Sequence, residues 1–204
     1  MGFYQRHLLP RLIHLGMRQR QLVSLRERMV GLARGRVLEV GVGSGLNLPF
    51  YGREIEELVG IDSSRELLTM ARKHTSWVHF PVKLMECGAE RLPLEDRSVD
   101  SVVMTWTLCS IGDPRRALAE MRRVLRPDGA LIFVEHGQAP EAAVRRWQER
   151  LTPVWRKVAG GCHLDRPVAR LIEASGLRLV DLESGYMVKG PKAFTFHYRG
   201  RAVA

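Results

Sequence analysis

The most informative segment of the sequence is Val37-Leu38-Glu39-Val40-Gly41-Val42-Gly43-Ser44-Gly45. It begins as an apolar run typical of a buried strand and ends in three alternating glycines. A glycine has no Cβ, so the backbone can approach a ligand where any other residue would collide with it. In an open sheet of parallel strands, ligands bind beyond the carboxyl ends of the strands. The stretch therefore predicts a strand over 36–41 that leads into a ligand-binding loop.

An acidic residue, Asp62, follows the next predicted strand, 58–61, and lies 21 residues after Gly41. A carboxylate in this place accepts hydrogen bonds from both hydroxyls of a ribose. The glycines form the pattern G-x-G-x-G, whereas dinucleotide-binding folds prefer G-x-G-x-x-G. Two structural alternatives stay open: Asp62 as the N-cap of the following helix, and Glu39 as a solvated strand residue.

Short apolar runs alternate with helical stretches through the middle of the chain. The expected strands cover 36–41, 58–61, 78–85, 99–104 and 130–135, and the expected helices cover 64–74 and 114–126. Such alternation predicts an α/β fold with a Rossmann-like, doubly wound, mostly parallel sheet. Further helices are expected over 141–158 and 165–174, the second capped by Asp165, and strands over 177–182 and 193–198 predict a terminal antiparallel hairpin.

The first 35 residues are predicted to form an amphipathic arm, with residues 36–204 as the main domain. Leucines recur there at mostly three-, four- and seven-residue spacings, which predicts one or two helices broken near Pro10 or Gly16. Residues 1–36 contain eight arginines and one acid, Glu27, and so hold +7 of the net charge of +10. Such a segment suits nucleic acid, anionic lipid or an acidic partner, and equally a solvated helix face.

The composition, with 45% hydrophobic and 26% charged residues among 204, is that of a globular chain. The longest apolar run, 102–111, is too short to cross a membrane, and the N-terminal residues do not form a secretory signal. Three cysteines, Cys87, Cys109 and Cys162, contain no C-x-x-C pair and predict neither a disulfide framework nor a metal site. We therefore expect a cytoplasmic protein without a metal, with peripheral membrane contact as an option.

Ordered motifs between Val37 and Val134 resemble those of the class I S-adenosylmethionine-dependent methyltransferases. They are E-x-G-x-G-x-G at 39–45, V-G-I-D-S-S at 59–64, G-A-E-R-L-P at 88–93, S-V-D-S-V-V at 98–103 and R-V-L-R-P-D-G at 123–129. The resemblance implies the class I methyltransferase fold, with S-adenosyl-L-methionine as the cofactor.

The same resemblance implies which residues hold the methionine part of that cofactor. Gly41, Gly43 and Gly45 would cradle its amino-acid end, and Glu39 would reach its ammonium group directly or through water. Thr105, just past the fourth strand, would lie under the methyl donor.

It also implies which residues hold the nucleoside part. Asp62 would bind the ribose, and Ser63 would lie beside the adenine. The loop of Gly88 and Ala89 would offer a backbone N–H to an adenine nitrogen. Many relatives carry an aspartate where this chain has Gly88; two alternatives stay open, that Glu90 replaces it or that this contact with the adenine is missing.

The segment after the fourth strand, 105–111, carries no N/D-P-P-Y/F motif of the kind found in enzymes that methylate the amines of bases. Nucleic acid is therefore disfavoured as a partner despite the basic charge. The strings T-L-C-S-I at 107–111, F-V-E-H at 133–136 and G-C-H-L-D-R at 161–166 resemble membrane-associated thiol methyltransferases and their bacterial relatives. This chain has the basic amphipathic arm where the membrane-bound members have an apolar anchor.

We therefore expect methyl transfer to a small, fairly apolar nucleophile, with a thiol favoured. The alternatives are a phospholipid amine or a quinone precursor, and, from another class, a cofactor-binding protein without catalysis. Cofactor chemistry supplies the leaving group, so the protein mainly orients the reactants.

Two histidines are the candidate catalytic residues. His136 follows the fifth strand at the ligand-facing edge, and a packed, hydrogen-bonded histidine is the structural alternative. His163 lies in a loop beside Asp165 and Arg166, where a loop-stapling role is the alternative. The N-terminal helices and the helix over 141–158 are expected to close over the acceptor as a lid.

Overall fold

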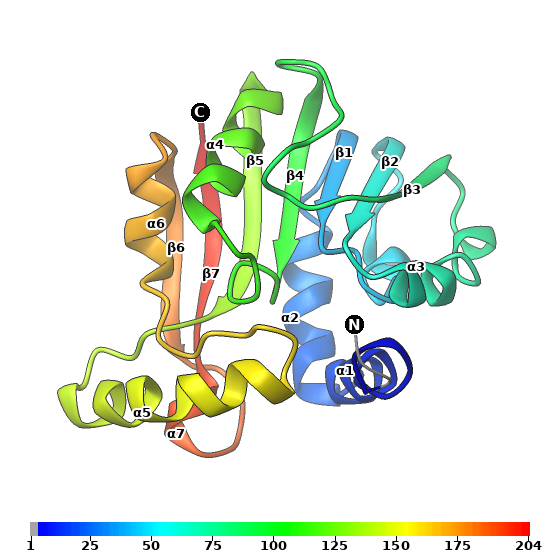
Figure 1. Ribbon diagram of the computed structural model, residues 1–204. Coiled ribbons are helices and arrows are strands. Elements are labelled where there is room, and N and C mark those ends of the chain that lie inside the picture. The colour runs from blue at the N-terminus through cyan, green and yellow to red at the C-terminus, as the bar shows by residue number, and fades with distance from the viewer. Residues whose placement is uncertain (1–3) are drawn as a thin grey trace.

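A seven-stranded sheet forms the centre of the protein, of which the computed structural model describes residues 4–204. The strand order is β3-β2-β1-β4-β5-β7-β6 (Figure 1). Neighbours among β1 to β5 pair in parallel, whereas β7 lies antiparallel between β5 and β6. The predicted Rossmann-like sheet with a terminal antiparallel strand is confirmed.

Each predicted strand overlaps an observed one, but several bounds differ: the third begins at Val82 and not at 78, and the fifth begins at Leu125, so that it takes in the end of the predicted helix 114–126. The observed bounds are β1 Gly35–Val40, β2 Ile55–Asp62, β3 Val82–Glu86, β4 Val99–Thr105, β5 Leu125–His136, β6 Arg178–Tyr186 and β7 Phe196–Val203. The last strand differs from the prediction of 193–198, because Lys192–Thr195 forms the short helix α7 after Pro191. The apolar pattern of 193–198 therefore spans a helical turn and the beginning of a strand.

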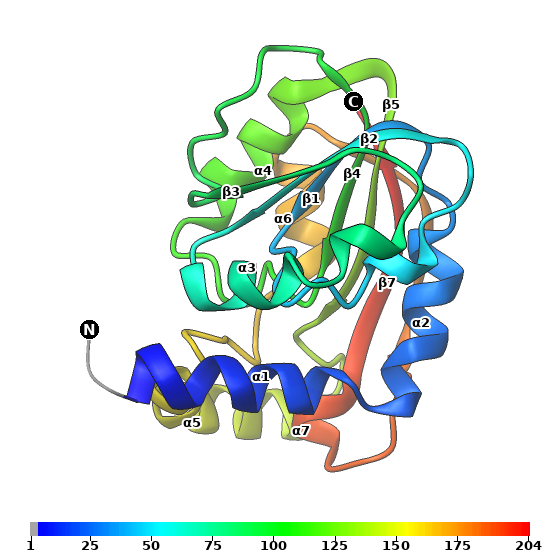
Figure 2. The same cartoon turned by 90° about the vertical axis from the view of Figure 1, so that its right-hand side faces the viewer.

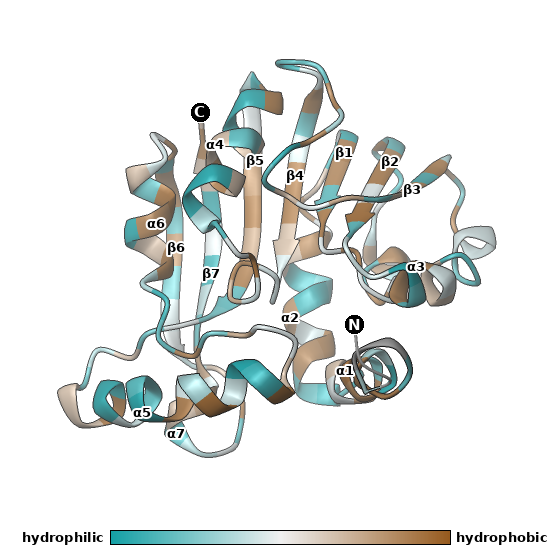
Figure 3. Ribbon diagram, in the orientation of Figure 1, coloured by the Kyte–Doolittle hydropathy of each residue, from teal (hydrophilic) through white to brown (hydrophobic). Residues whose placement is uncertain are grey.

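The central strands are buried on both faces, as expected of a parallel sheet between helices. Successive residues of β5 belong to opposite cores: Leu131 and Phe133 pack with α4 and α6, and Ile132 and Val134 pack with α2. Figure 2 shows α4 and α6 on one face of the sheet and α2 on the other. The hydropathy colouring follows this arrangement, with apolar residues concentrated in β4 and β5 (Figure 3).

Seven α-helices and three short helical turns surround the sheet in the described chain. The helices are α1 Leu9–Met17, α2 Arg20–Val30, α3 Arg65–Ala71, α4 Pro114–Val124, α5 Ala142–Val158, α6 Val168–Ala174 and α7 Lys192–Thr195. The turns are a π-helical turn, Tyr4–Leu8, and 3₁₀ turns at Leu48–Phe50 and Thr75–Trp77.

Local chemistry explains where several helices begin. The Ser64 hydroxyl accepts a hydrogen bond from the Leu67 N–H at the start of α3, and Asp113 caps α4 in the same way. The predicted cap Asp165 is wrong, because α6 begins after Pro167 without a side-chain cap.

The predicted break in the N-terminal arm lies between α1 and α2. It falls at Arg18 and Gln19, just after Gly16, and not at Pro10. Pro10 lies in the first turn of α1, where its missing N–H would have no partner in any case.

Two helices lie beyond the carboxyl ends of the parallel strands. Figures 1 and 2 both place α1 and α5 there, apart from the helices that cover the faces of the sheet. The basic, amphipathic N-terminal segment and the long helix of the C-terminal third therefore meet at the edge where a bound ligand would lie.

Truncation of the largest fully buried side chain tests the two-sided core. We expect Phe133→Ala to lower the free energy of unfolding by about 3–5 kcal/mol, because the ring is enclosed and its cavity cannot collapse fully. Urea unfolding followed by circular dichroism measures this. Trp77→Ala is the control, since Trp77 is 71% exposed and should change stability by no more than about 0.5 kcal/mol. Equal losses in the two variants would contradict the packing described here.

Candidate functional site

A cavity of ≈ 1190 Å³ opens at the carboxyl edge of the sheet. Its lining comes from the glycine loop, from the ends of β2 and β4, from α1 and α2, and from the C-terminal part of α5. Pockets for a single small ligand usually measure about 300–1,000 Å³. This cavity therefore has the size to hold a cofactor and an acceptor together.

The three glycines of the loop all adopt positive φ angles, of +72° at Gly41, +55° at Gly43 and +79° at Gly45. A Cβ at Gly41 would lie 2.2 Å from Thr107 Oγ1, and one at Gly45 would lie 3.2 Å from Ala71 Cα. At Gly43 the nearest atom would be a backbone oxygen 3.9 Å away. Gly41 and Gly45 are thus required by the packing of the protein, and Gly43 leaves open space for a ligand.

The carboxylate of Asp62 is held at the end of β2 by two backbone N–H groups. Gly43 N donates to Oδ2 at 3.0 Å and Ser64 N donates to Oδ1 at 2.8 Å. Burial raises the pKa of Asp62, and the two N–H groups oppose that shift. The cap of α3 is Ser64 and not Asp62, so both carboxylate oxygens keep lone pairs for a ligand that enters the cavity.

Glu39 lies beneath the loop and is only 1% exposed. Its Oε1 accepts from Asn47 Nδ2 and its Oε2 accepts from the Tyr51 hydroxyl, both at 2.8 Å. Burial raises the pKa of Glu39 to about 7 against these hydrogen bonds. Glu39 is absent from the residues that line the cavity, so its predicted contact with the cofactor ammonium stays a prediction.

Asn47 is the residue that presents this network to the cavity, and the sequence analysis missed it. Its amide nitrogen also donates to Thr105 Oγ1 at 2.9 Å, which ties the glycine loop to the end of β4. Its buried Oδ1 has no partner among the described residues. A buried acceptor oxygen without a partner, on a residue that lines the cavity, fits the ammonium end of S-adenosylmethionine.

The remaining predicted cofactor residues, Ser63, Gly88, Ala89 and Glu90, all line the same cavity. A Cβ at Gly88 would lie 2.8 Å from Glu90 Oε2. The Glu90 carboxylate therefore occupies the space that a larger residue at position 88 would take. The contact of Glu90 with the adenine stays a prediction.

The mixed seven-stranded sheet, the glycine loop at its first strand and the acid at the end of its second define a class of protein. This is the class I S-adenosylmethionine-dependent methyltransferase. The cradle at Gly43, the fixed carboxylate of Asp62 and the orphaned oxygen of Asn47 fit S-adenosyl-L-methionine.

Comparison with known proteins gives the same class. A family model described as a methyltransferase domain matches residues 38–133. The human protein named thiol S-methyltransferase TMT1B is 33% identical over 196 residues, which cover 91% of this chain and 78% of that protein. The rat protein of that name is 34% identical over 150 residues, or 72% of this chain, and this match spans only 62% of its own length.

A phosphatidylethanolamine N-methyltransferase from Cereibacter sphaeroides is 35% identical over 152 residues, with 72% of each chain covered. Among solved structures, a SAM-dependent methyltransferase from Thermotoga maritima, titled a possible histamine N-methyltransferase, superposes with a TM-score of 0.68. It is 23% identical and covers 97% of this chain and 98% of that one. The chain belongs to the S-adenosylmethionine-dependent methyltransferase family and is a methyltransferase.

Apolar and basic residues line the cavity as well. Leu9, Leu12 and Ile13 line it from α1, while Arg26 reaches it from α2. The Arg26 guanidinium lies 4.7 Å from the centre of the Trp106 ring and donates to the Met17 carbonyl at 2.8 Å. Burial lowers the pKa of Arg26 to about 10, so its charge persists at neutral pH.

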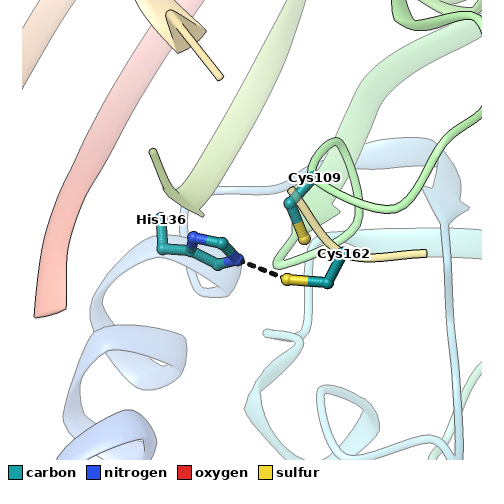
Figure 4. Close-up of side chains that lie close together, drawn as sticks. All are labelled: Cys109, His136 and Cys162. Atoms are coloured by element: carbon teal, nitrogen blue, oxygen red, sulfur yellow. Dashed lines mark hydrogen bonds between the residues drawn. The ribbon is translucent and has the colours of Figure 1, made fainter. Parts of the chain in front are cut away.

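His136, one of the two predicted catalytic residues, lies in this cavity at the end of β5. Its Nε2 is 3.0 Å from Cys162 Sγ, and Cys109 lies beside them (Figure 4). No spacing in the sequence indicates this grouping, because the three residues come from separate loops and strand ends. His136 is thus both a half-buried, hydrogen-bonded histidine and a residue of the cavity wall.

His163, the other predicted catalytic residue, does not line the cavity. Its backbone N–H donates to the Cys109 carbonyl at 2.8 Å, and its Nδ1 lies 3.8 Å from Asp165 Oδ1. The backbone contact corresponds to the loop-stapling alternative. A catalytic role for His163 stays a prediction without a contact to the cavity.

Loss of the Asp62 carboxylate tests the cofactor site. We expect Asp62→Ala to raise the Kd for S-adenosylmethionine at least tenfold, because hydrogen bonds to a charged group contribute about 1.5–3 kcal/mol. Isothermal titration calorimetry measures the Kd. Asp128→Ala is the matched control, since Asp128 is exposed in the loop segment at the start of β5. An unchanged Kd in the Asp62 variant would remove Asp62 from the site.

Proposed function

We propose that this methyltransferase transfers the methyl group to the sulfur of a small, fairly apolar thiol. One observation supports this acceptor class more than any other. Part of the cavity lining comes from α1, α2, α5 and the segment between β6 and β7. This part contains four cationic residues and, among the described residues, no acid. The four are Arg26, Arg156, Lys157 and Lys189.

A positive field of this kind favours a thiol over an amine as the acceptor. Cations near a thiol stabilise its thiolate and lower its pKa, and the thiolate is the reactive nucleophile. A protonated amine would enter the same region without a carboxylate to pair with it. The names of the TMT1B relatives, which are thiol methyltransferases, agree with the choice made on electrostatic grounds.

The chain's own residues supply binding, orientation and exclusion of water. Bound S-adenosylmethionine supplies an electrophilic methyl group, which replaces the proton that the acceptor thiol has lost to solvent. The loop around Gly43 and the carboxylate of Asp62 hold the cofactor side, while Leu9 and Ile13 of α1 cover the acceptor side. Holding the two reactants together in one cavity is the main contribution expected of the protein.

His136 is the residue that we propose for contact with the acceptor. It lies in the cavity wall beside Cys162, on the side of the cavity that Arg26 and Trp106 also line. His163 lies behind this wall, and we propose it as a residue that holds the loop of Cys162 in place.

The acceptor class and the charge effect can be tested together. Labelled methyl transfer would be measured with alkyl thiols, phosphatidylethanolamine vesicles and a quinone precursor, using wild type and Arg26→Gln. We expect the label to enter the thiols. Loss of the Arg26 charge should raise the pKa of the acceptor thiol by about one unit, which lowers the thiolate fraction, and with it the rate of Arg26→Gln, roughly tenfold near pH 7. The difference in rate between wild type and Arg26→Gln should shrink above pH 9, because the thiolate then forms without the help of the cation.

Two further variants separate charge from packing at this position. Arg26→Lys keeps the charge and should restore most of the rate at pH 7. Arg150→Gln removes a cation of α5 that does not line the cavity, and should act as wild type. Label that enters only the lipid amine, or a defect of Arg26→Gln that is equal at every pH, would contradict the thiol proposal.

We further propose that the mouth of the cavity lies against an anionic membrane surface. Large apolar side chains are exposed on α1 and α5, among them Leu15 at 67% and Val154 at 68%. Leu12, Trp147 and Val158 are exposed on the same two helices. Arginines and lysines lie between them in the sequence, which is the pattern of helices that lie on a charged bilayer. No helix of the described chain is long and apolar enough to span a membrane.

Vesicle flotation tests this surface. We expect binding to vesicles that contain phosphatidylserine, weaker binding at 0.5 M salt because the charges are screened, and none to purely zwitterionic vesicles. The double variant Leu15→Ser and Val154→Ser should lose most of the binding. Trp77→Ser, which removes an exposed apolar residue outside both helices, should retain it. Equal binding by the two variants would exclude this face as the membrane contact.

A further inference from the structure

Three metal-ligating side chains meet in the wall of the cavity: Cys109, His136 and Cys162. Each offers one donor atom, and the three donor atoms all lie within 4.8 Å of one another. Figure 4 shows both sulfurs and the imidazole Nε2 turned toward a common point. The cofactor residues described above include none of the three.

The two loops that carry the cysteines are fastened to each other and to the sheet. The His163 N–H donates to the Cys109 carbonyl at 2.8 Å, which joins the two loops directly beside both sulfurs. The buried Glu135 carboxylate accepts the N–H groups of Thr107 and Leu108 at 2.7 and 3.0 Å and so fixes the start of the Cys109 loop. The arrangement of the donor atoms is therefore built into the backbone.

The sulfur of Cys162 has the surroundings of a bound thiolate rather than those of a packed apolar thiol. Trp155 Nε1–H donates to it at 3.2 Å, in addition to the contact with His136 Nε2 at 3.0 Å. Hydrogen bonds from outer residues to ligating atoms are a regular feature of metal sites, where they orient the ligands. Buried cysteines without such a role behave as small hydrophobic residues.

We propose that Cys109, His136 and Cys162 bind one zinc ion through two sulfurs and one nitrogen, with a fourth position open to the cavity. Zn–S and Zn–N bonds of about 2.3 and 2.1 Å place tetrahedral donor atoms roughly 3.5–3.8 Å apart. Donor atoms within 4.8 Å reach that spacing through small side-chain rotations. Two thiolates and an imidazole select zinc over magnesium or calcium, which prefer oxygen ligands.

The net charge of the metal centre and its access from the cavity both agree with a zinc site. Zinc binding releases the two thiol protons to solvent, and the resulting Cys₂His centre is electrically neutral. All three ligands line the cavity, so a fourth ligand reaches the ion from the acceptor side. Three protein ligands with one open position are typical of catalytic zinc, whereas structural zinc has four protein ligands.

The open position has a consequence for the acceptor, and this step rests on the proposed function. A thiol that coordinates zinc loses its proton to solvent and stays a thiolate at neutral pH. The ion would thus hold the acceptor sulfur in the cavity beside the cofactor residues. Zinc binding itself does not depend on this step.

Cobalt substitution tests the site through its own absorption. The chain would be stripped with a chelator, and Co²⁺ would be titrated in while the thiolate-to-cobalt charge-transfer band is recorded. We expect one Co²⁺ per chain, displaced by one Zn²⁺. Cys109→Ser, Cys162→Ser and His136→Ala should each weaken Co²⁺ binding at least tenfold. Trp155→Phe, which removes only the outer hydrogen bond, should weaken it about tenfold.

Cys87→Ser is the matched control, because Cys87 is the third cysteine and lies outside the cluster. It should bind Co²⁺ as wild type does. Calorimetric binding of S-adenosylmethionine by every variant verifies that each is folded. Absence of the charge-transfer band in wild type, or an unchanged band in the Cys109 and Cys162 variants, would overturn the zinc site.

Thiol methylation measured on the stripped and reloaded samples separates this inference from the proposed function. The stripped protein could methylate thiols at the full rate and still bind one Co²⁺ after reloading. That result would support the zinc site but exclude a role for the ion in binding the acceptor. Methylation without any metal binding would leave the thiol proposal standing and overturn the zinc site.

Discussion

The buried carboxylate of Glu39 is the constraint around which the cofactor site is organised. A carboxylate without contact to water is costly unless hydrogen bonds compensate it. The chain provides them by folding 47–51 back under β1, so that Asn47 and Tyr51 both reach Glu39. This return path sets the course of the glycine loop, and Asn47 links it to Thr105 at the end of β4. The proposed cofactor cradle thus rests on this buried hydrogen-bond network, in which Asn47 Oδ1 has no partner among the described residues.

The cavity lining carries both signs of charge. Asp62 and Glu90 belong to it, and their carboxylates suit the hydroxyl and amine groups of a nucleoside. Arg26 and Lys157 line the same cavity, together with apolar residues of α1 and α5. Because both signs of charge line one cavity, the positively charged methyl donor and the proposed anionic sulfur would each find an opposite charge there.

The fold alone does not select the acceptor. Solved structures of the same fold superpose over almost the whole chain at about one fifth identity, and a shared fold hosts many activities. In this chain α1, α5 and the loops of Cys109 and Cys162 line the cavity at the carboxyl ends of the strands. The choice of acceptor is therefore expected to depend on these segments.

Features whose parts lie close together in the chain could be predicted from the amino-acid sequence. The glycine loop, the acid of Asp62 and the alternation of strands and helices are local patterns, because backbone conformation and strand burial depend on near neighbours. The errors of prediction were also local: capping by Asp165 and the helical turn of α7 depended on packing that a short window of residues does not contain.

Which distant residues share the cavity became clear from the folded chain alone. Asn47, Arg26 and the cluster of Cys109, His136 and Cys162 belong to loops and helices far apart in the sequence. Parallel strands end at one common edge, so the crossover connections bring their following loops together whatever the number of residues between them. The pairing of one loop with another depends on that geometry, which no spacing in the sequence records.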